Sequence, residues 1–314
     1  SAQWVRSQLA MYDVGGWLAK GPAGMEYIPV MVAEHEIPFI VAAYQQGIRD
    51  FDEEKALEAM VKMQTTPWAD DLGGGQAGNK DLEVYRKLGY VPHGGGMSSN
   101  TMEYAYDDFC VAQMAKALGK EDLYTQFMKR AANWRNLIDA AIGFARPKDE
   151  NGNWIEPYEP LKKVEGWTEG NAWQYTWFVP HNPVGLIDII GKEVFVRNLN
   201  DGFEKSEPLR YNAPLEQYWD YPVCHGNQPA MQVSYLFNYA GKPWLTQKWN
   251  RSIQDRYYGY GVGDAYLGDE DQGQMSGWFV MSALGLFQTD GGCRVDPIYE
   301  IASPRFEKVT LHLN

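Results

Sequence analysis

The chain contains Trp-Thr-Glu-Gly-Asn-Ala-Trp-Gln (167–174), His-Gly-Asn-Gln-Pro (225–229) and Gly-Asp-Glu-Asp-Gln-Gly-Gln-Met-Ser (268–276). Each segment stands immediately before an apolar, aromatic-rich run with helical spacing. If these runs are successive helices of one barrel, their N-termini bring carboxyl, amide and aromatic side chains around a single pocket. The three segments therefore predict a helical fold whose site is built from helix starts.

Helical signals dominate the rest of the chain, and we predict an all-α fold. Several predicted helices stop at a glycine, the residue that best tolerates the left-handed conformation found after a helix C-terminus. The one convincing strand signal is at the end, where residues 308–313 alternate with a period of two. The predicted helices cover residues 2–18, 36–46, 53–63, 102–118, 122–144, 171–190, 193–203, 229–240, 244–257 and 274–286.

The connections between these helices differ in length. Those near Gly119 and Gly241 are tight, whereas the segments 64–101, 145–170, 204–228 and 258–273 are long and rich in Gly, Pro and Trp. Long loops in a compact domain are usually functional. The pattern predicts a toroid of paired helices, with the long loops rimming one mouth.

Composition excludes several classes of partner. With 314 residues, of which 45% are hydrophobic, the chain can bury a large core. It carries 28 Lys and Arg against 41 Asp and Glu, a net charge of −13. We therefore expect it to bind neither nucleic acid nor an anionic membrane surface. The aromatic content of 14%, with 12 Trp and 20 Tyr, suits a protein that stacks rings on the apolar faces of sugars.

The three cysteines are an odd count without C-x-x-C spacing, which argues against a disulfide framework or a zinc site. Cys110 falls on an apolar helix face, and we expect a buried thiol there. No segment approaches 18 consecutive apolar residues, and Ser1 is not followed by a charged and then apolar leader. A removed signal peptide would leave no trace in this chain.

The carboxyl groups of the first and third segments suit the hydrolysis of a glycosidic bond, which needs a protonated acid and a carboxylate base. Glu169 is the acid candidate, because the neighbouring rings of Trp167 and Trp173 are expected to desolvate its carboxyl and raise its pKa. The structural alternative is a Glu at a helix start, favoured there by the helix dipole.

Asp269 and Asp271 are the base candidates, since two carboxylates two residues apart beside Glu270 repel each other and can hold one water between them. Asp269 with Gln272 also forms a plain capping box, which is the structural alternative. A cap formed by Asn100 with Glu103 likewise leaves a structural role open for Glu103 and Asp107.

Longer motifs resemble glycoside hydrolase family 92 over essentially the whole chain. They are residues 102–108, 169–175 with 178–181, 225–229 with 235–241, and 268–276. The resemblance implies an (α/α)6 toroid, calcium dependence and inversion by single displacement. It also implies exo-acting release of α-linked mannose from N-glycans or mannans, by a secreted or periplasmic enzyme. Within it, Glu169 falls on the proton donor, and Asp269 and Asp271 fall on the base pair.

The same resemblance suggests binding residues. We predict that the substrate contacts Trp167, Trp173, Glu103, Gln228 and His225, and that Asn227 and Gln228 supply oxygen ligands to calcium. Family members carry Gly-Asn-Glu-Pro where this chain has Gly-Asn-Gln-Pro, and an amide cannot act as a proton-donating acid. If Gln228 occupied the donor position, the substrate would be a mannose-1-phospho-6-mannose diester, whose leaving group departs unprotonated.

The family pattern also extends beyond this chain. A β-sandwich and further helices normally precede the matched region, and more strands follow it. We therefore expect residues 1–303 to form a toroid that lacks its first helices, and residues 304–314 to begin a C-terminal β segment. A non-catalytic mannan-binding paralogue remains an alternative, whereas a phosphorylase or lyase would need a basic cluster that the sequence lacks.

Overall fold

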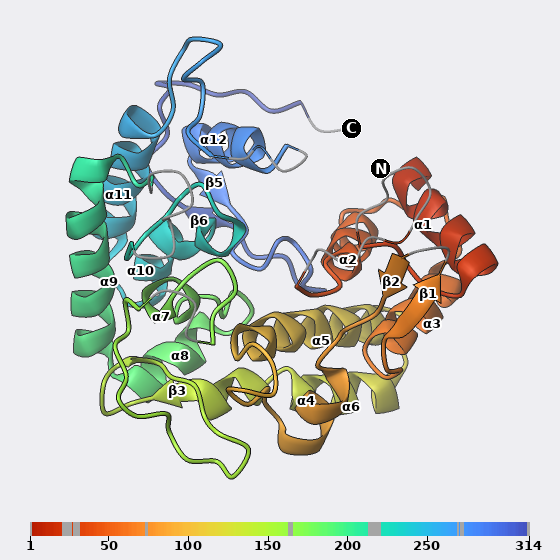
Figure 1. Ribbon diagram of the computed structural model, residues 1–314. Helices are drawn as coiled ribbons and strands as arrows, with labels where there is room; N and C mark the ends of the chain where they lie inside the picture. Colours follow the sequence, from red (N-terminus) through yellow and green to blue (C-terminus); the bar gives the residue numbers. More distant parts are fainter. Residues whose placement is uncertain are drawn as a thin grey trace. The chain divides into compact units, whose positions relative to one another are not determined.

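The computed structural model describes residues 2–20, 27, 32–72, 75–162, 166–212, 221–268, 270 and 273–312. The described chain is mostly helical, as predicted, and its strands are short two-stranded pairs (Figure 1). It divides into two compact units. Unit 1 contains residues 1–137, 147–155 and 290–297, and unit 2 contains residues 138–146, 156–289 and 298–314.

Unit 1 is organised around one long helix. Every residue of α5 from Ser99 through Ala115 is buried, and α2 and α6 pack against it (Figure 1). The helices of unit 1 are α1 (Ala2–Gly15), α2 (Glu36–Gln45), α3 (Glu53–Met63), α4 (Leu82–Leu88), α5 (Ser99–Ala117) and α6 (Glu121–Arg130). A hairpin of β1 (Ala69–Leu72) and β2 (Gly75–Ala77) and the 3-10 helix η1 (Asn133–Leu137) complete it.

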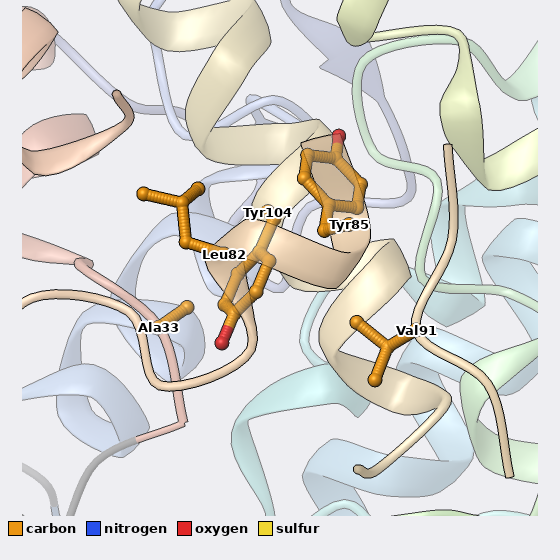
Figure 2. Packing of buried hydrophobic residues seen from close by; sticks show 5 residues of the cluster. All are labelled: Ala33, Leu82, Tyr85, Val91 and Tyr104. Atoms are coloured by element: carbon orange, nitrogen blue, oxygen red, sulfur yellow. The ribbon is translucent and has the colours of Figure 1, made fainter. Parts of the chain in front are cut away.

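A small apolar cluster fixes α4 on α5. Its members are Ala33, Leu82, Tyr85, Val91 and Tyr104, all fully buried (Figure 2). The rings of Tyr85 and Tyr104 meet edge to face with centroids 5.4 Å apart, a favoured aromatic geometry. The Tyr85 hydroxyl also donates to Asp108 Oδ2 at 2.8 Å, so this buried phenol is satisfied.

Unit 2 contains six helices among its described residues. They are α7 (Ala172–Tyr175), α8 (Pro183–Ile190), α9 (Lys192–Ser206), α10 (Leu236–Tyr239), α11 (Pro243–Arg256) and α12 (Gln274–Leu284), with the 3-10 helices η2 (Glu207–Leu209), η4 (Gln228–Ala230) and η5 (Val233–Tyr235). The short strands β3 (Ile138–Asp139) and β4 (Phe144–Ala145) pair antiparallel, as do β5 (Leu286–Phe287) and β6 (Glu300–Ile301). Phe203 stacks on Trp249 with ring centroids 5.2 Å apart, which packs α9 against α11.

Most predicted helices are present, but three of them are interrupted. The one predicted over 122–144 ends at Arg130 and gives way to η1 and the β3–β4 hairpin. The one over 171–190 stops at Tyr175, and a new helix starts at Pro183 with Asn182 as its cap. Proline lacks the N–H that a continuous helix needs, so the break follows from the sequence. The run over 229–240 folds as two 3-10 turns before α10.

The C-terminal strand predicted over 308–313 is not formed in the part that the structure describes. Residues 308–312 carry no strand assignment and are exposed. An alternating pattern becomes a strand only when a neighbouring strand pairs with it, and no described segment does so here. Among the described residues, no helix has the length and apolar character needed to cross a bilayer.

Candidate functional site

Glu169 lies in a tight turn two residues before the N-cap of α7. Its φ is +49°, in the left-handed region that non-glycine residues rarely adopt, and its side chain is exposed. Holding such a residue there costs on the order of 1–3 kcal/mol, and strained positions of this kind cluster at functional sites. The predicted desolvation of this carboxyl by neighbouring rings does not agree with its exposure.

The buried polar residues that follow Glu169 fasten this turn to the next motif. Asn171 caps α7 by accepting the Gln174 amide on Oδ1 at 3.2 Å. Its Nδ2 donates to the Tyr221 carbonyl at 3.1 Å, and Gln174 Nε2 donates to the same carbonyl at 2.6 Å. The Glu169 turn is thereby joined to the segment that leads into His225.

Asn227 makes the direct link between the first and second motifs. Its Nδ2 donates to the Glu169 carbonyl at 3.1 Å, and its Oδ1 accepts the Gln228 amide at 3.0 Å at the start of η4. Both ends of this amide side chain are therefore occupied. Segments 58 residues apart in sequence meet at Glu169, as the three-segment interpretation requires.

Two glycines link the second motif to the third. A Cβ atom added to Gly268 would lie 2.6 Å from Gly226 Cα and 2.4 Å from Tyr257 Oη, closer than real side chains approach. The two backbones therefore touch, and only glycine fits. Asp269 and Asp271, the predicted base pair, lie outside the described residues, but Gly268 is the chain neighbour of Asp269.

His225 is enclosed by aromatic rings. Its ring centroid lies 4.8 Å from Tyr257, 5.6 Å from Tyr258 and 4.3 Å from Trp278. Burial lowers the pKa of His225 to about 3, so the imidazole is neutral. Tyr258 donates its hydroxyl proton to the Met275 carbonyl at 3.1 Å and accepts from His225 Nε2 at 2.9 Å. This chain of hydrogen bonds positions His225 against the first turn of α12.

Glu270 is the described carboxyl next to the predicted base pair. Its Oε1 accepts the Ser276 amide at 3.3 Å near the start of α12, and its Oε2 is buried without a hydrogen-bond partner among the described residues. The predicted capping box of Asp269 and Gln272 lies outside those residues. Glu270 therefore contributes to capping the first turn of α12, and the capping box of Asp269 and Gln272 stays a prediction.

The two tryptophans beside Glu169 each pack one ring face or edge against another aromatic ring. Trp167 is 1% exposed, stacks on Tyr175 at 5.6 Å and donates Nε1 to Tyr158 Oη at 3.2 Å. Trp173 lies 4.7 Å from the Phe144 ring. Their predicted contact with substrate remains a prediction.

Glu103 is in unit 1, where it takes part in a cluster that the sequence did not reveal. His35 Nε2 lies 2.9 Å from Glu103 Oε2, and its Nδ1 lies 3.3 Å from Asp107 Oδ1. Burial lowers the pKa of His35, but the charges and hydrogen bonds of Asp107 and then Glu103 outweigh it and hold the pKa well above the usual value. The imidazolium thus bridges two carboxylates that are four residues apart on α5.

The same cluster extends to two further carboxyls. Lys20 Nζ lies 2.9 Å from Glu34 Oε1, with both side chains almost fully buried. Burial, and next the charge of Glu34, raise the pKa of Glu36 well above its usual value. The one available signal in the sequence was the spacing of Glu103 and Asp107, since like charges at i and i+4 on one helix face repel and need a positively charged partner.

The part of the chain that the structure describes shows no cluster of acidic side chains that would hold calcium. No group of three or more His, Cys, Asp or Glu in that part is arranged to hold a metal ion. The side-chain oxygen of Asn227, a predicted ligand, accepts the Gln228 amide on one of its two lone pairs. We therefore derive no step through calcium, which remains an implication of the family resemblance.

Comparisons with known proteins agree with the motifs. An α-mannosidase of family 92 from Bacteroides thetaiotaomicron, solved in complex with mannoimidazole, is 35% identical with a TM-score of 0.82, and the match covers 96% of this chain and 40% of that one. An inverting mannosidase of the same family and organism is 34% identical with a TM-score of 0.84, covering 98% and 42%. An uncharacterized secreted glycosidase of Arthroderma benhamiae is 28% identical over 311 residues, 87% of this chain and 37% of that protein.

The chain thus spans about two fifths of the length of these relatives. Residues 1–314 match the model of the glycosyl hydrolase family 92 catalytic domain. Because that match covers the whole chain, this chain belongs to glycosyl hydrolase family 92.

Proposed function

We propose that the protein is an α-mannosidase that releases terminal α-linked mannose from N-glycans or mannans with inversion at the anomeric carbon. Two contacts carry the proposal: Asn227 Nδ2 donates to the Glu169 carbonyl at 3.1 Å, and Gly226 touches Gly268. The segments that carry the acid and base candidates therefore share one location in unit 2.

In the proposed reaction Glu169 gives its proton to the departing glycosidic oxygen. Asp269 and Asp271 take a proton from the water that attacks the anomeric carbon from the opposite face, as inverting enzymes require. The Glu169 carboxyl is exposed, and a bound sugar would exclude water from it. Exclusion of water favours the protonated form that a general acid needs.

The remaining residues of the site have supporting roles. We propose that His225 and Gln228 contact the sugar hydroxyls and that Trp167 and Trp173 shape the wall. The substrate contact of Glu103, which is buried in unit 1 beside His35, stays a prediction. The proposal has four further parts. They are the (α/α)6 toroid over 1–303, the β segment from 304, an N-terminal β-sandwich in the full-length protein and a secreted or periplasmic location. Family membership and the secreted relative support them.

The test uses the full-length protein and proton NMR of the released sugar. We expect the β-anomer of mannose to appear first from an α-mannobiose. Glu169→Gln should lower kcat/KM on mannobiose by about 10²- to 10⁴-fold, the usual size of general-acid catalysis, and much less on a mannoside with an activated aryl leaving group. Glu204→Gln, which changes an exposed carboxyl on α9, is the matched control and should leave both rates unchanged.

Other outcomes would replace parts of the proposal. Equal losses on both substrates would remove Glu169 from the donor role. Turnover of mannose-1-phosphate esters alone would move the donor position to Gln228, and binding without turnover would make the chain a mannan-binding paralogue. The same assay with a calcium chelator measures whether turnover requires calcium, independently of the other readouts.

A further inference from the structure

A segment from the C-terminal part of the chain packs along α5 in unit 1. Residues 290–297, which we call the strap, belong to unit 1, although the residues on both sides of it in the chain belong to unit 2. At its start, Tyr106 donates its hydroxyl to the Asp290 carbonyl at 3.0 Å. Near its end, the Val295 amide donates to Gln113 Oε1 at 3.2 Å. The strap and α5 therefore run side by side in the same direction.

This register places two thiols against each other. Tyr106 and Cys110 are one helical turn apart on α5, so they share a face. Cys293 Sγ lies 3.8 Å from Tyr106 Oη, on that same face. Burial, followed by the hydrogen bond and charge of Cys293, raises the pKa of the Cys110 thiol well above its usual value. The two sulfur atoms are thus neighbours in a shielded position.

Both side chains are inaccessible to solvent. Cys110 and Cys293 are each 0% exposed and are free thiols in this structure. Cys293 Sγ also donates to the Pro38 carbonyl at 3.4 Å, and the Arg294 guanidinium lies 5.3 Å above the Phe109 ring. The strap is therefore held on α5 by several contacts, which keep the two thiols in register.

We propose that Cys110 and Cys293 are a disulfide-forming pair that closes in an oxidising compartment and fastens the strap covalently to α5. The pairing joins residues 183 positions apart in the sequence and leaves Cys224 outside the disulfide. This proposal does not depend on the proposed mannosidase activity.

The chemistry requires an external disulfide such as oxidised glutathione. The thiolate of Cys293 attacks one sulfur of glutathione disulfide, which forms a mixed disulfide and releases one glutathione thiolate. The thiolate of Cys110 then attacks Cys293 Sγ and displaces the second glutathione. Two protein thiols are oxidised, one glutathione disulfide is reduced to two thiols, and the two protein protons end on the released glutathione.

Because the thiolate is the attacking form and both thiols are buried, the folded reduced protein reacts slowly. Bond formation takes place while the strap is off α5, during folding or during a local opening. Refolding in the presence of oxidant should therefore close the pair faster than treating the folded protein.

The experiment uses the full chain, denatured and reduced, and then refolded in glutathione buffer that is either oxidising or reducing. Thiols are counted after denaturation, and a tryptic digest without reductant is mapped by mass spectrometry. We expect one thiol in place of three after oxidative refolding, and a cross-linked peptide pair that contains Cys110 and Cys293. Three remaining thiols, or a cross-link through Cys224, would overturn the proposal.

Serine variants give a second readout. Cys224→Ser should lose one thiol, still form the cross-link and keep the gain of several degrees in Tm that oxidation gives the parent. Cys110→Ser and Cys293→Ser should each show the same Tm with and without oxidant. If Cys110→Ser or Cys293→Ser fails to fold, the thiol counts of the parent and of Cys224→Ser are sufficient to test the pairing. A Tm gain that persists in Cys293→Ser would contradict the pairing.

Discussion

His35 in unit 1 and His225 in unit 2 have different charge states because their surroundings differ. In unit 1, His35 is 38% exposed and bridges two carboxylates, which keep it charged. In unit 2, His225 is 1% exposed and surrounded by rings, and burial lowers its pKa to about 3. Neighbouring charge outweighs desolvation at His35, whereas at His225 no charge of the described residues compensates it. A histidine's role therefore follows from its neighbours.

The largest effect is expected at His35. His35→Phe leaves the buried carboxylates of Glu103 and Asp107 without their counter-charge. Breaking a buried ion pair typically costs 3–5 kcal/mol, and the partial exposure of this ring reduces our expectation to about 2–3 kcal/mol. Denaturant unfolding of the full chain at pH 7 measures it.

A surface ion pair is the matched control. Lys55→Met removes the pair with Asp13, whose side chains are 35% and 53% exposed, and should cost less than about 1 kcal/mol. Equal losses for His35→Phe and Lys55→Met would mean that the His35 bridge adds nothing beyond a surface contact.

A smaller effect is expected where the motif backbones touch. Gly268→Ala inserts a methyl group against Gly226 and Tyr257, and overpacking of this kind costs about 1–3 kcal/mol. Mannoside turnover should fall as well, because the neighbouring Asp269 shifts with the backbone. Gly277→Ala in α12 is the control, since nothing lies within 4 Å of its added Cβ. That variant should be neutral or gain about 0.5–1 kcal/mol. Unchanged mannoside turnover in Gly268→Ala would mean that the contact between Gly226 and Gly268 does not position the catalytic residues.

The pH dependence of stability should have opposite signs for the two histidines. The folded pKa of His35 is raised, so its contribution is fully present below about pH 6.5 and is lost as pH rises through the folded value. The folded pKa of His225 is lowered to about 3. Its unfolded form takes up a proton first, and stability falls by up to about 1.4 kcal/mol per pH unit as pH drops from about 6.5 toward 3. Unfolding curves from pH 4 to 9 for His35→Phe and His225→Phe should each lack one of these slopes. Parallel profiles for both variants would contradict the assignment of charge.

The smallest stability effect is expected for His225→Phe at neutral pH. The new ring suits the aromatic surroundings, and one hydrogen bond to Tyr258 is lost, which costs about 1 kcal/mol. If His225 contacts substrate as proposed, kcat/KM on mannosides should fall far more than stability. Wild-type turnover in this variant would assign His225 to packing alone.

The sequence predicted the helical class and the buried Cys110, because helix spacing and apolar patterning are local signals. It predicted that the three motifs meet from their shared position before helices, and the contact of Asn227 with Glu169 agrees with this. It missed the helix breaks before Pro183 and after Arg130, where turns interrupt an apolar pattern that continues along the sequence. It also missed the His35 bridge and the contact of Gly226 with Gly268, since both join segments that are distant in the chain. The desolvation predicted for Glu169 failed because rings adjacent in sequence, Trp167 among them, turn away into the core.

The return of residues 290–297 to unit 1 has a consequence for synthesis on the ribosome. An N-terminal portion released early, such as 1–137, would leave the side of α5 around Tyr106 and Gln113 uncovered. The first unit therefore finishes folding only after residue 297 has left the exit tunnel. Nascent chains stalled before that point should be more sensitive to protease than those stalled after it.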